Sequence, residues 1–255
     1  MKKIGLALSG GGARGIAHLG VIQALEELGV RFYEIAGTSA GAIVGALYAN
    51  GHSPKEIFEI IKTVSLYRSV SPAWGAGGGW LKMDGLQEML RKHLPLDFAT
   101  LKLPFTAAAT EIRKGEIHYI NEGELVPVLL ASCSLPGIFH PMALSSGLYV
   151  DGGVLDNLPS LPLTKNCDFV VGSHCNLVSP TFDPTSTKAV IERTLLMAIG
   201  AITWSSKRLC NVVIEPPGLD KYTVFDIGKA KEIYDVGYKF TKENFNKQHF
   251  LEMLA

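Results

Sequence analysis

The sequence predicts a three-layer α/β/α fold, in which a mainly parallel central sheet lies between helices. Short apolar runs of strand length alternate with segments of helical periodicity along the chain, as they do in layered α/β domains. Residues 4–8 are continuously apolar, which suits a strand buried on both faces of a parallel sheet. The next strand follows after one helix, and the right-handed crossover of such a β-α-β unit makes the two strands parallel.

The composition is that of one globular domain. The 255 residues are 47% hydrophobic, which is enough for one large core, so residues 1–255 are expected to form a single domain. Lys and Arg number 24 and Asp and Glu number 24, so no basic field attracts a nucleic-acid partner. The four cysteines lack Cys-x-x-Cys spacing, which predicts free thiols in a reducing compartment. No apolar run reaches the roughly 18 residues of a membrane span, so we expect a cytoplasmic protein that meets a membrane only peripherally.

The first elements follow from periodicity and capping signals. The apolar stripe over residues 16–28 has helical spacing and ends at Gly29, a natural residue after a helix. Residues 32–36 form the second expected strand, and residues 42–49 form a buried helix. Ser53-Pro54-Lys55-Glu56 is a capping box with proline at the first helical position, so another helix begins there.

Residues 64–82 lack periodicity and include a glycine-rich stretch between Trp74 and Trp80. We expect an ordinary mobile surface loop. Because glycines permit hinging and tryptophans suit an interface, a lid or an interfacial contact is the alternative.

The rest of the chain continues the alternation. Helices are expected at residues 84–93, 125–132, 187–209 and 227–247, and strands at 104–112, 116–120, 148–150, 168–173 and 211–215. Within the first long helix, residues 197–204 are apolar on nearly every side. We expect this stretch to be a buried core helix, and contact with a membrane or a partner subunit is the alternative.

A nucleophile elbow is the first chemical signal. Gly37-Thr38-Ser39-Ala40-Gly41 has the Gly-x-Ser-x-Gly form and joins the second strand to the following helix. On such a sharp turn the serine stands clear of the sheet edge, and Gly37 and Gly41 let strand and helix approach without Cβ clashes. Ser39 is therefore the candidate nucleophile. The alternative is a turn of small residues in which Ser39 only caps the helix.

A glycine-rich loop, Gly10-Gly11-Gly12-Ala13-Arg14-Gly15, follows the first strand and opens a helix. It formally matches the Gly-x-Gly-x-x-Gly fingerprint of dinucleotide sites, which also need an acidic residue at the end of the second strand. Here that strand ends in Gly37-Thr38-Ser39, and Glu34 lies within it, so nucleotide binding is a minor alternative. Amides at a helix N-terminus also stabilise an oxyanion. Because this loop and Ser39 reach the same sheet edge, the loop is the candidate oxyanion hole, and a tight packing turn is the other alternative.

A base for Ser39 is expected at the end of a later strand. Asp151-Gly152-Gly153 follows the apolar residues 148–150, and parallel pairing of that strand would bring the Asp151 carboxylate to the edge where Ser39 lies. A structural Asp-Gly-Gly turn is the alternative. His174 leaves a Ser-Asp-His triad open, because it follows Asp151 in the chain order of α/β-hydrolases.

Together these residues resemble the patatin-like phospholipase family. The three signatures of that family correspond to the Gly-rich loop 10–15, the elbow 37–41 and the Asp-Gly-Gly motif 151–153. Residues 131–141 are similar to the family's segment before the catalytic aspartate, and Asn157-Leu158-Pro159 is similar to the segment after it. The resemblance covers about residues 4–175, and the residues beyond carry no signature.

The resemblance implies a patatin-like fold and a Ser39–Asp151 dyad without histidine, which hydrolyses acyl esters of lipids through an acyl-serine. A phospholipase A or lysophospholipase is expected, with a lipid substrate met at a membrane or micelle surface. Burial of Asp151 would raise its pKa and make it a better base. Arg14 is expected either to orient the loop or meet a lipid phosphate, or to be a solvated residue at a helix start. No metal or cofactor is expected, because no His-Glu-x-x-His or comparable spacing occurs.

Overall fold

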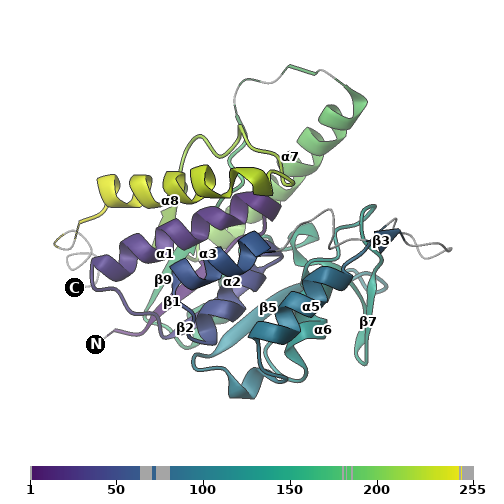
Figure 1. Cartoon of the computed structure of the whole chain (residues 1–255), viewed down its shortest axis with the longest axis horizontal. Coiled ribbons are helices and arrows are strands. Elements are labelled where there is room, and N and C mark those ends of the chain that lie inside the picture. The colour runs from purple at the N-terminus through teal and green to yellow at the C-terminus, as the bar shows by residue number, and fades with distance from the viewer. Residues whose placement is uncertain are drawn as a thin grey trace.

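The structure is a computed structural model that describes residues 2–63, 71–72, 81–179, 181, 183–184, 186–246 and 248. A central sheet flanked by helices forms the body of the molecule (Figure 1), which confirms the predicted fold class. Most of the segment expected to be a loop or lid, residues 64–70 and 73–80, lies outside the described residues. The residues described within and beside it pair as two short antiparallel strands, β3 (Ser71–Pro72) and β4 (Leu81–Lys82).

The main sheet has eight strands. They are β1 (Ile4–Leu8), β2 (Glu34–Thr38), β5 (Phe105–Glu111), β6 (Glu116–Ile120), β7 (Met142–Leu144), β8 (Gly147–Asp151), β9 (Phe169–Ser173) and β10 (Val212–Ile214). Their order is β10-β9-β1-β2-β5-β8-β7, and β6 also pairs with β5. The strands from β10 to β5 in this order are parallel, whereas β6, β7 and β8 pair antiparallel. The β1–β2 unit is parallel, as the crossover rule predicts.

Seven α-helices and five short 3₁₀ helices complete the described chain. The α-helices are α1 (Ala17–Glu27), α2 (Ala40–Ala49), α3 (Pro54–Thr63), α5 (Asp84–His93), α6 (Leu125–Ser132), α7 (Thr187–Lys207) and α8 (Ala230–Asn244). The 3₁₀ helices are η1 (Gly12–Ile16), η2 (Phe98–Thr100), η3 (Gly152–Val154), η4 (Leu161–Lys165) and η5 (Ile227–Lys229). The capping box is confirmed, because the Ser53 amide donates to Glu56 Oε2 at 2.7 Å and the Glu56 amide donates to Ser53 Oγ at 3.3 Å. None of the described helices is long and apolar enough to cross a membrane.

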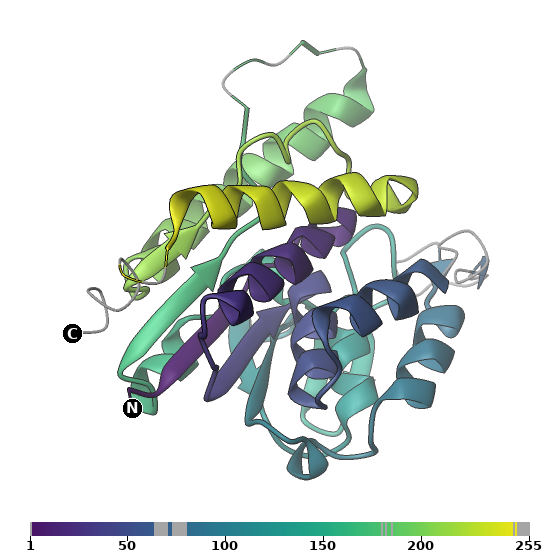
Figure 2. The same ribbon diagram turned by 60° about the vertical axis from the view of Figure 1, so that its left-hand side comes forward.

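The two faces of the sheet are covered unequally. Leu6, Leu8 and Ile35 point into the large core beneath α1 and α2, whereas Ala7 and Ala36 join a small cluster with residues 158–170. On the first face α8 lies directly over α1 (Figure 2). The two helices approach so closely that a Cβ on Gly20 would lie 2.2 Å from the Tyr234 carbonyl oxygen, which explains the glycine at this crossing.

The expected core helix at residues 197–204 is not buried. Met197 is 55% exposed and Trp204 is 62% exposed, although α7 forms where the sequence predicts a helix. Only Thr203 and Ser206, near the C-terminal end of α7, are buried among the described side chains of the helix. Hydrophobicity thus predicted the helix correctly and its burial wrongly.

Candidate active site

The candidate site lies where two strands end on the same flank of β5. Strand β2 runs parallel to β5 with Thr38 opposite Ala108, and β8 runs antiparallel to β5 with Asp151 opposite Ala109. Strand β6 occupies the other flank of β5 over both of these positions. The ends of β2 and β8 therefore abut. The expectation that parallel pairing brings Asp151 to Ser39 is wrong, because β8 arrives from the opposite direction and its register produces the meeting.

Ser39 has the backbone conformation of a nucleophile elbow. With φ 53° and ψ −122°, it is the only non-glycine residue with positive φ among the described residues. Its side chain makes no capping hydrogen bond to α2, although it stands at the N-cap position, so helix capping does not explain the strained serine. Its amide donates to Ser132 Oγ at 2.9 Å, and Ser132 Oγ in turn donates to the Ala108 carbonyl at 2.7 Å. This chain of hydrogen bonds ties the elbow to β5.

The elbow glycines are required by close backbone approach. A Cβ on Gly41 would lie 2.4 Å from the Leu8 carbonyl oxygen, and a Cβ on Gly37 would lie 2.5 Å from the Gly41 carbonyl oxygen. Helix α2 therefore starts directly against the end of β1. This packing brings Ser39 next to the glycine-rich loop, since a Cβ on Gly10 would lie 3.2 Å from Ser39 Cβ.

Asp151 is a buried carboxyl group beside Ser39. It is 5% exposed, and its Oδ1 accepts a hydrogen bond from the Gly153 amide at 2.8 Å. Burial raises the pKa of Asp151 from 3.8 to about 6, while hydrogen bonding with the Ser39 side chain and the Gly153 amide lowers the pKa and limits the rise. Gly152 contacts β5 so closely that its Cβ would lie 2.4 Å from the Ala108 carbonyl oxygen. Gly152 thus allows the turn to pack against β5, and the Asp151 carboxyl faces the serine.

The loop 10–15 has two amides available to a ligand. Several of its other amides already have acceptors: Gly10 donates to the Asn157 carbonyl, Ala13 to the Val224 carbonyl and Arg14 to the Gly11 carbonyl, at 3.1, 2.8 and 3.2 Å. Gly15 packs against Ala40, whose Cβ would lie 2.7 Å from a Cβ at this position. Within the described part of the chain, the amides of Gly11 and Gly12 donate to no carbonyl or side-chain acceptor.

Buried side chains hold this loop in position. His18 contacts Ser173 Oγ through Nδ1 at 2.8 Å and the Ser9 carbonyl through Nε2 at 2.9 Å. Burial lowers the pKa of His18 to about 4, so the ring is neutral, and Nε2 must carry the proton because a carbonyl only accepts. His18 therefore fixes the residue that precedes Gly10.

Arg14 orients the loop rather than reaching solvent. It is 4% exposed, and its Nε donates to the Tyr222 carbonyl at 2.7 Å. Together with the bond from the Ala13 amide to Val224, this contact attaches the loop to the segment after β10. Of the two alternatives for Arg14, the solvated residue at a helix start is therefore wrong.

His174, the histidine of the alternative triad, has a different partner. Its Nδ1 lies 2.7 Å from Glu215 Oε1, and Lys207 Nζ lies 2.5 Å from the same oxygen. Its Nε2 is buried and has no hydrogen-bond partner in the described chain. Burial lowers the pKa of His174, whereas hydrogen bonds from His174 and Lys207 hold the pKa of Glu215 at about 2. The Asp151 carboxyl thus accepts a hydrogen bond from the Gly153 amide and lies beside the Ser39 side chain, whereas His174 pairs with Glu215 of the C-terminal region.

Glu34 is not placed to serve as the acidic residue of a nucleotide site. Glu34 begins β2, at the opposite edge of the sheet from the glycine-rich loop, and its Oε2 accepts a hydrogen bond from Asn166 Nδ2 at 2.9 Å. Among the described side chains, no three His, Cys, Asp or Glu residues cluster in a way that could hold a metal ion.

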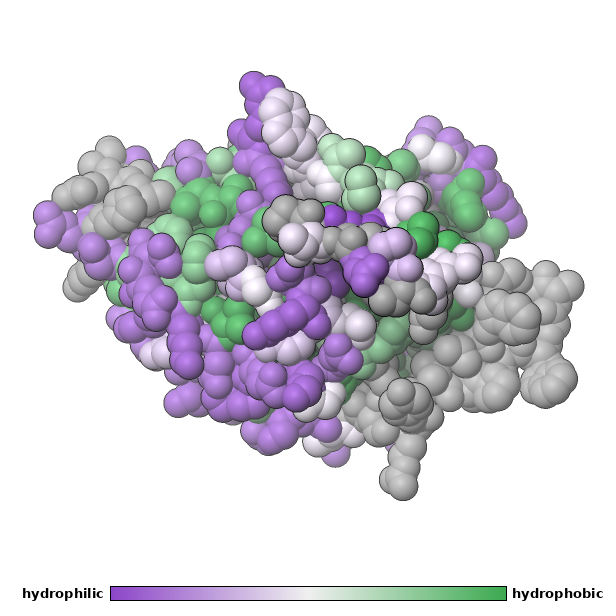
Figure 3. All heavy atoms as spheres, turned by 90° about the horizontal axis from the view of Figure 1, so that it is seen from above, coloured by the Kyte–Doolittle hydropathy of each residue, from purple (hydrophilic) through white to green (hydrophobic). Residues whose placement is uncertain are grey.

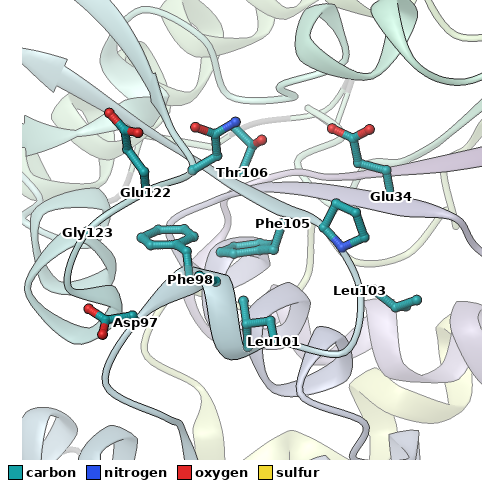
Figure 4. A pocket seen from close by; sticks show the side chains of 12 residues that line it. Glu34, Asp97, Phe98, Leu101, Leu103, Phe105, Thr106, Glu122 and Gly123 are labelled. Atoms are coloured by element: carbon teal, nitrogen blue, oxygen red, sulfur yellow. The ribbon is translucent and has the colours of Figure 1, made fainter.

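Two cavities are present whose linings do not include Ser39. The larger, of about 490 Å³, opens at the Glu34 edge of the sheet (Figure 4), where the carboxylates of Glu34, Asp97 and Glu122 lie apart from one another around Phe98 and Phe105. The smaller, of about 170 Å³, is mostly apolar and is lined by Met83, Asp84, Gln87, Leu130, Ser134, Phe139, His140, Pro141 and Met142. It adjoins the candidate site, because the Ser134 carbonyl accepts the Asp151 amide at 3.0 Å.

The sequence analysis assigned no role to Ser132, Asn157 or His18. Ser132 and Asn157 lie in the segments that resemble the family before and after the aspartate, so their signal was present without a function attached. His18 lies on the buried stripe of α1 and could have been noticed as a polar residue at a core position.

Comparison with known proteins identifies relatives of this chain. Residues 6–164 match the family described as Patatin-like phospholipase. An uncharacterized NTE family protein of Mycobacterium bovis is 35% identical over 179 residues, which are 68% of this chain and 49% of that protein. Lysophospholipase NTE1 of Kluyveromyces lactis is 31% identical over 275 residues, covering 93% of this chain and 19% of the relative. The chain thus spans about half of the mycobacterial relative and about a fifth of the fungal one.

One solved structure has the same fold. The crystal structure of VipD from Legionella pneumophila superimposes with a TM-score of 0.54 and 18% sequence identity. The match covers 95% of this chain and 66% of that chain.

Proposed function

The chain belongs to the patatin-like phospholipase family, and from that premise we propose that it is a serine hydrolase of lipid acyl esters, of the phospholipase A or lysophospholipase type. The fungal relative is a lysophospholipase, which supports a lipid ester as the substrate class. The observation that carries the proposal is the strained Ser39 beside the buried carboxyl of Asp151. A lipid substrate implies that the enzyme works at a membrane or micelle surface.

The first half-reaction forms an acyl-serine. The Ser39 oxygen adds to the ester carbonyl carbon, its proton passes to the Asp151 carboxylate, and the carbonyl electron pair moves onto oxygen. When the tetrahedral intermediate collapses, the bond to the alcohol breaks and Asp151 returns the proton to the departing oxygen. The alcohol leaves, and the acyl group stays on Ser39.

The second half-reaction releases the acid. Asp151 accepts a proton from water while the water oxygen adds to the acyl carbon. Collapse then expels the Ser39 oxygen, which takes the proton back from Asp151, and the carboxylic acid departs. The serine and the carboxylate are restored, so no other reactant is consumed.

The raised pKa of Asp151 suits a dyad without histidine. An ordinary aspartate is a weak base, but a carboxyl group with a pKa of about 6 is still ionised at neutral pH and accepts a proton more readily. The Gly11 and Gly12 amides are the proposed oxyanion donors, because the amides of Gly10, Ala13 and Arg14 already donate to main-chain carbonyls. One such donor contributes on the order of 3 kcal/mol to the transition state.

We also propose that residues 1–255 act as one domain. The segment after β10 holds the glycine-rich loop through the Tyr222 and Val224 carbonyls, and α8 covers α1. These contacts support a C-terminal region that completes the hydrolase.

A fluorophosphonate probe tests the proposed chemistry. The purified chain should gain one probe adduct per molecule by intact-mass analysis, and Ser39→Ala should gain none while remaining folded by circular dichroism. The chain that is labelled should hydrolyse a short-chain nitrophenyl ester, and Ser39→Ala should not. A folded wild-type chain that is neither labelled nor active would contradict the proposal. If the chain is active, a panel of phospholipids, lysophospholipids and acylglycerols would identify its preferred substrate.

A further inference from the structure

Helix α7 is anchored to the body of the molecule near its C-terminal end, whereas in its N-terminal half Arg193 Nη2 donates to the Ser179 carbonyl of the preceding loop. Near its C-terminus, Ser206 Oγ donates to Asp156 Oδ1 at 2.8 Å, and Ser160 Oγ donates to the Ser206 carbonyl at 2.6 Å. Asp156 follows the Asp151-Gly-Gly turn by a few residues, so this end of α7 is fixed beside the candidate site. From there the helix extends away from the body of the molecule toward Thr187 (Figures 1 and 2).

The outer face of α7 is apolar. Six large hydrophobic side chains are exposed, from 38% for Ile202 to 63% for Ile191; the six are Val190, Ile191, Leu195, Met197, Ile202 and Trp204. At 100° per residue they fall within an arc of about 180°, over a length of about 20 Å. A surface helix normally turns its apolar side inward, so α7 is inverted in this respect.

Exposed apolar side chains also occur in the segment that follows the candidate site. Val154, next to Gly153, and Leu161, next to Ser160, are also exposed, and both belong to the stretch that anchors α7. Figure 3 looks down on this end of the molecule and shows hydrophobic surface open between hydrophilic groups. Exposed apolar surface of this extent marks a contact with a partner or a membrane.

The charge of α7 distinguishes between these partners. Residues 187–208 contain four basic residues and one acidic residue, and one of the four, Lys207, is in an ion pair with Glu215. The Arg208 guanidinium lies 4.8 Å from the centre of the Trp204 ring, and a tryptophan with a neighbouring cation suits the boundary between lipid tails and head groups. Two copies paired through this face would bring like charges together, whereas an anionic bilayer would attract them.

We propose that the outer face of α7 is the surface by which this chain lies on an anionic lipid bilayer, with the apolar arc in the head-group boundary. The choice of a lipid partner rests on the proposed function. The contact would hold the segment after Asp151 against the surface from which a lipid ester must enter.

Vesicle flotation tests this contact with the full chain carrying Ser39→Ala, so that no lipid is hydrolysed. Phosphatidylcholine vesicles containing phosphatidylglycerol should carry the protein upward more strongly than phosphatidylcholine alone, and added salt should weaken the binding. Ile191→Asp with Leu195→Asp should reduce binding at least about tenfold, since each change removes a side chain from lipid. The matched control is Tyr33→Asp with Leu96→Asp, two exposed apolar residues near the Glu34 edge, which should bind as the parent does.

Each outcome decides the matter. Equal flotation of the α7 variant and the control would overturn the proposal. It would also be overturned if the chain did not bind vesicles but formed a dimer in sedimentation equilibrium that the α7 changes disrupt. When the α7 changes are made in the chain that retains Ser39, hydrolysis of a soluble short-chain ester should be unaltered, which verifies that the variant is folded. Binding that depends on α7 in a chain without esterase activity would refute the proposed function and leave this contact standing.

Discussion

The candidate site is built by two regions that contribute in different ways. Residues 4–175 contribute reactive groups, the Ser39 hydroxyl, the Asp151 carboxyl and the loop amides. The region after residue 175 contributes main-chain carbonyls, those of Tyr222 and Val224, and the covering helix α8. The comparison teaches that chemistry is visible in residue identity, whereas support through the main chain is not, because any residue type has a carbonyl.

The largest expected effect tests which of the two regions supplies the base for Ser39. Asp151→Asn should reduce kcat/KM for a soluble ester by at least ~100-fold, because the variant has no carboxylate to accept the serine proton. His174→Ala should leave kcat/KM close to that of the wild type, because His174 pairs with Glu215 of the C-terminal region. Steady-state kinetics on both folded variants measures the contrast. A crippled His174→Ala with an active Asp151→Asn would replace the dyad with a triad.

The pH dependence of the wild type should report Asp151. Since the pKa of Asp151 is raised to about 6, kcat/KM should fall about tenfold per pH unit below that value as the base becomes protonated. Stability should change in the opposite sense. A carboxyl whose folded pKa is raised stabilises the fold while it is protonated, so its contribution is lost as pH rises from about 4 through about 6.

Urea denaturation across this range checks the stability half of the prediction. The free energy of unfolding of the wild type, taken relative to Asp151→Asn, should decrease as pH rises through the window. A difference between the two proteins that does not vary with pH would mean that Asp151 is solvated rather than buried.

Much of the first region was predictable from sequence. The glycines of the elbow and loop are required where backbones meet within van der Waals distance, so the pattern itself carries the geometry. The strand at residues 4–8, the hairpin of β5 and β6, and α6 also formed where local signals indicated.

The rest was not predictable for physical reasons. The alternation of a short strand does not encode its direction, so the antiparallel β8 could not be distinguished from a parallel strand. Periodicity does not reveal what covers an apolar helix, and α7 was therefore expected in the core. The burial of Arg14 depends on a carbonyl more than 200 residues away along the chain, and such a partner leaves no local pattern.

A smaller effect tests whether the C-terminal region supports the loop. Arg14→Lys should lower kcat about tenfold with little change in KM, because a lysine cannot reproduce the guanidinium geometry at the Tyr222 carbonyl and the oxyanion donors act mainly on the transition state. The control is Arg31→Lys, since exposed Arg31 also donates to a main-chain carbonyl, that of Val30, but far from the loop. Equal kinetics for the two variants would mean that the loop keeps its shape without the C-terminal segment.

The smallest effect on rate should accompany a clear effect on stability, at the crossing of α8 over α1. A Cβ on Gly237 would lie 2.2 Å from the Ala17 carbonyl oxygen, so Gly237→Ala forces the helices apart. We expect it to lower the free energy of unfolding by about 1–3 kcal/mol, although alanine favours a helix by about 1 kcal/mol over glycine.

Gly200→Ala is the matched control for that change, because Gly200 also lies within a helix and, among the residues that the structure describes, has no neighbour within 4 Å of an added Cβ. It should raise the free energy of unfolding by up to about 1 kcal/mol through propensity alone. Urea denaturation measures both, and kcat of Gly237→Ala should change less than that of Arg14→Lys, because the loop is held by residues 222–224 rather than by the helix crossing. A Gly237→Ala chain as stable as Gly200→Ala would show that α8 is not docked on α1, and the C-terminal region would then support the site only through its loop.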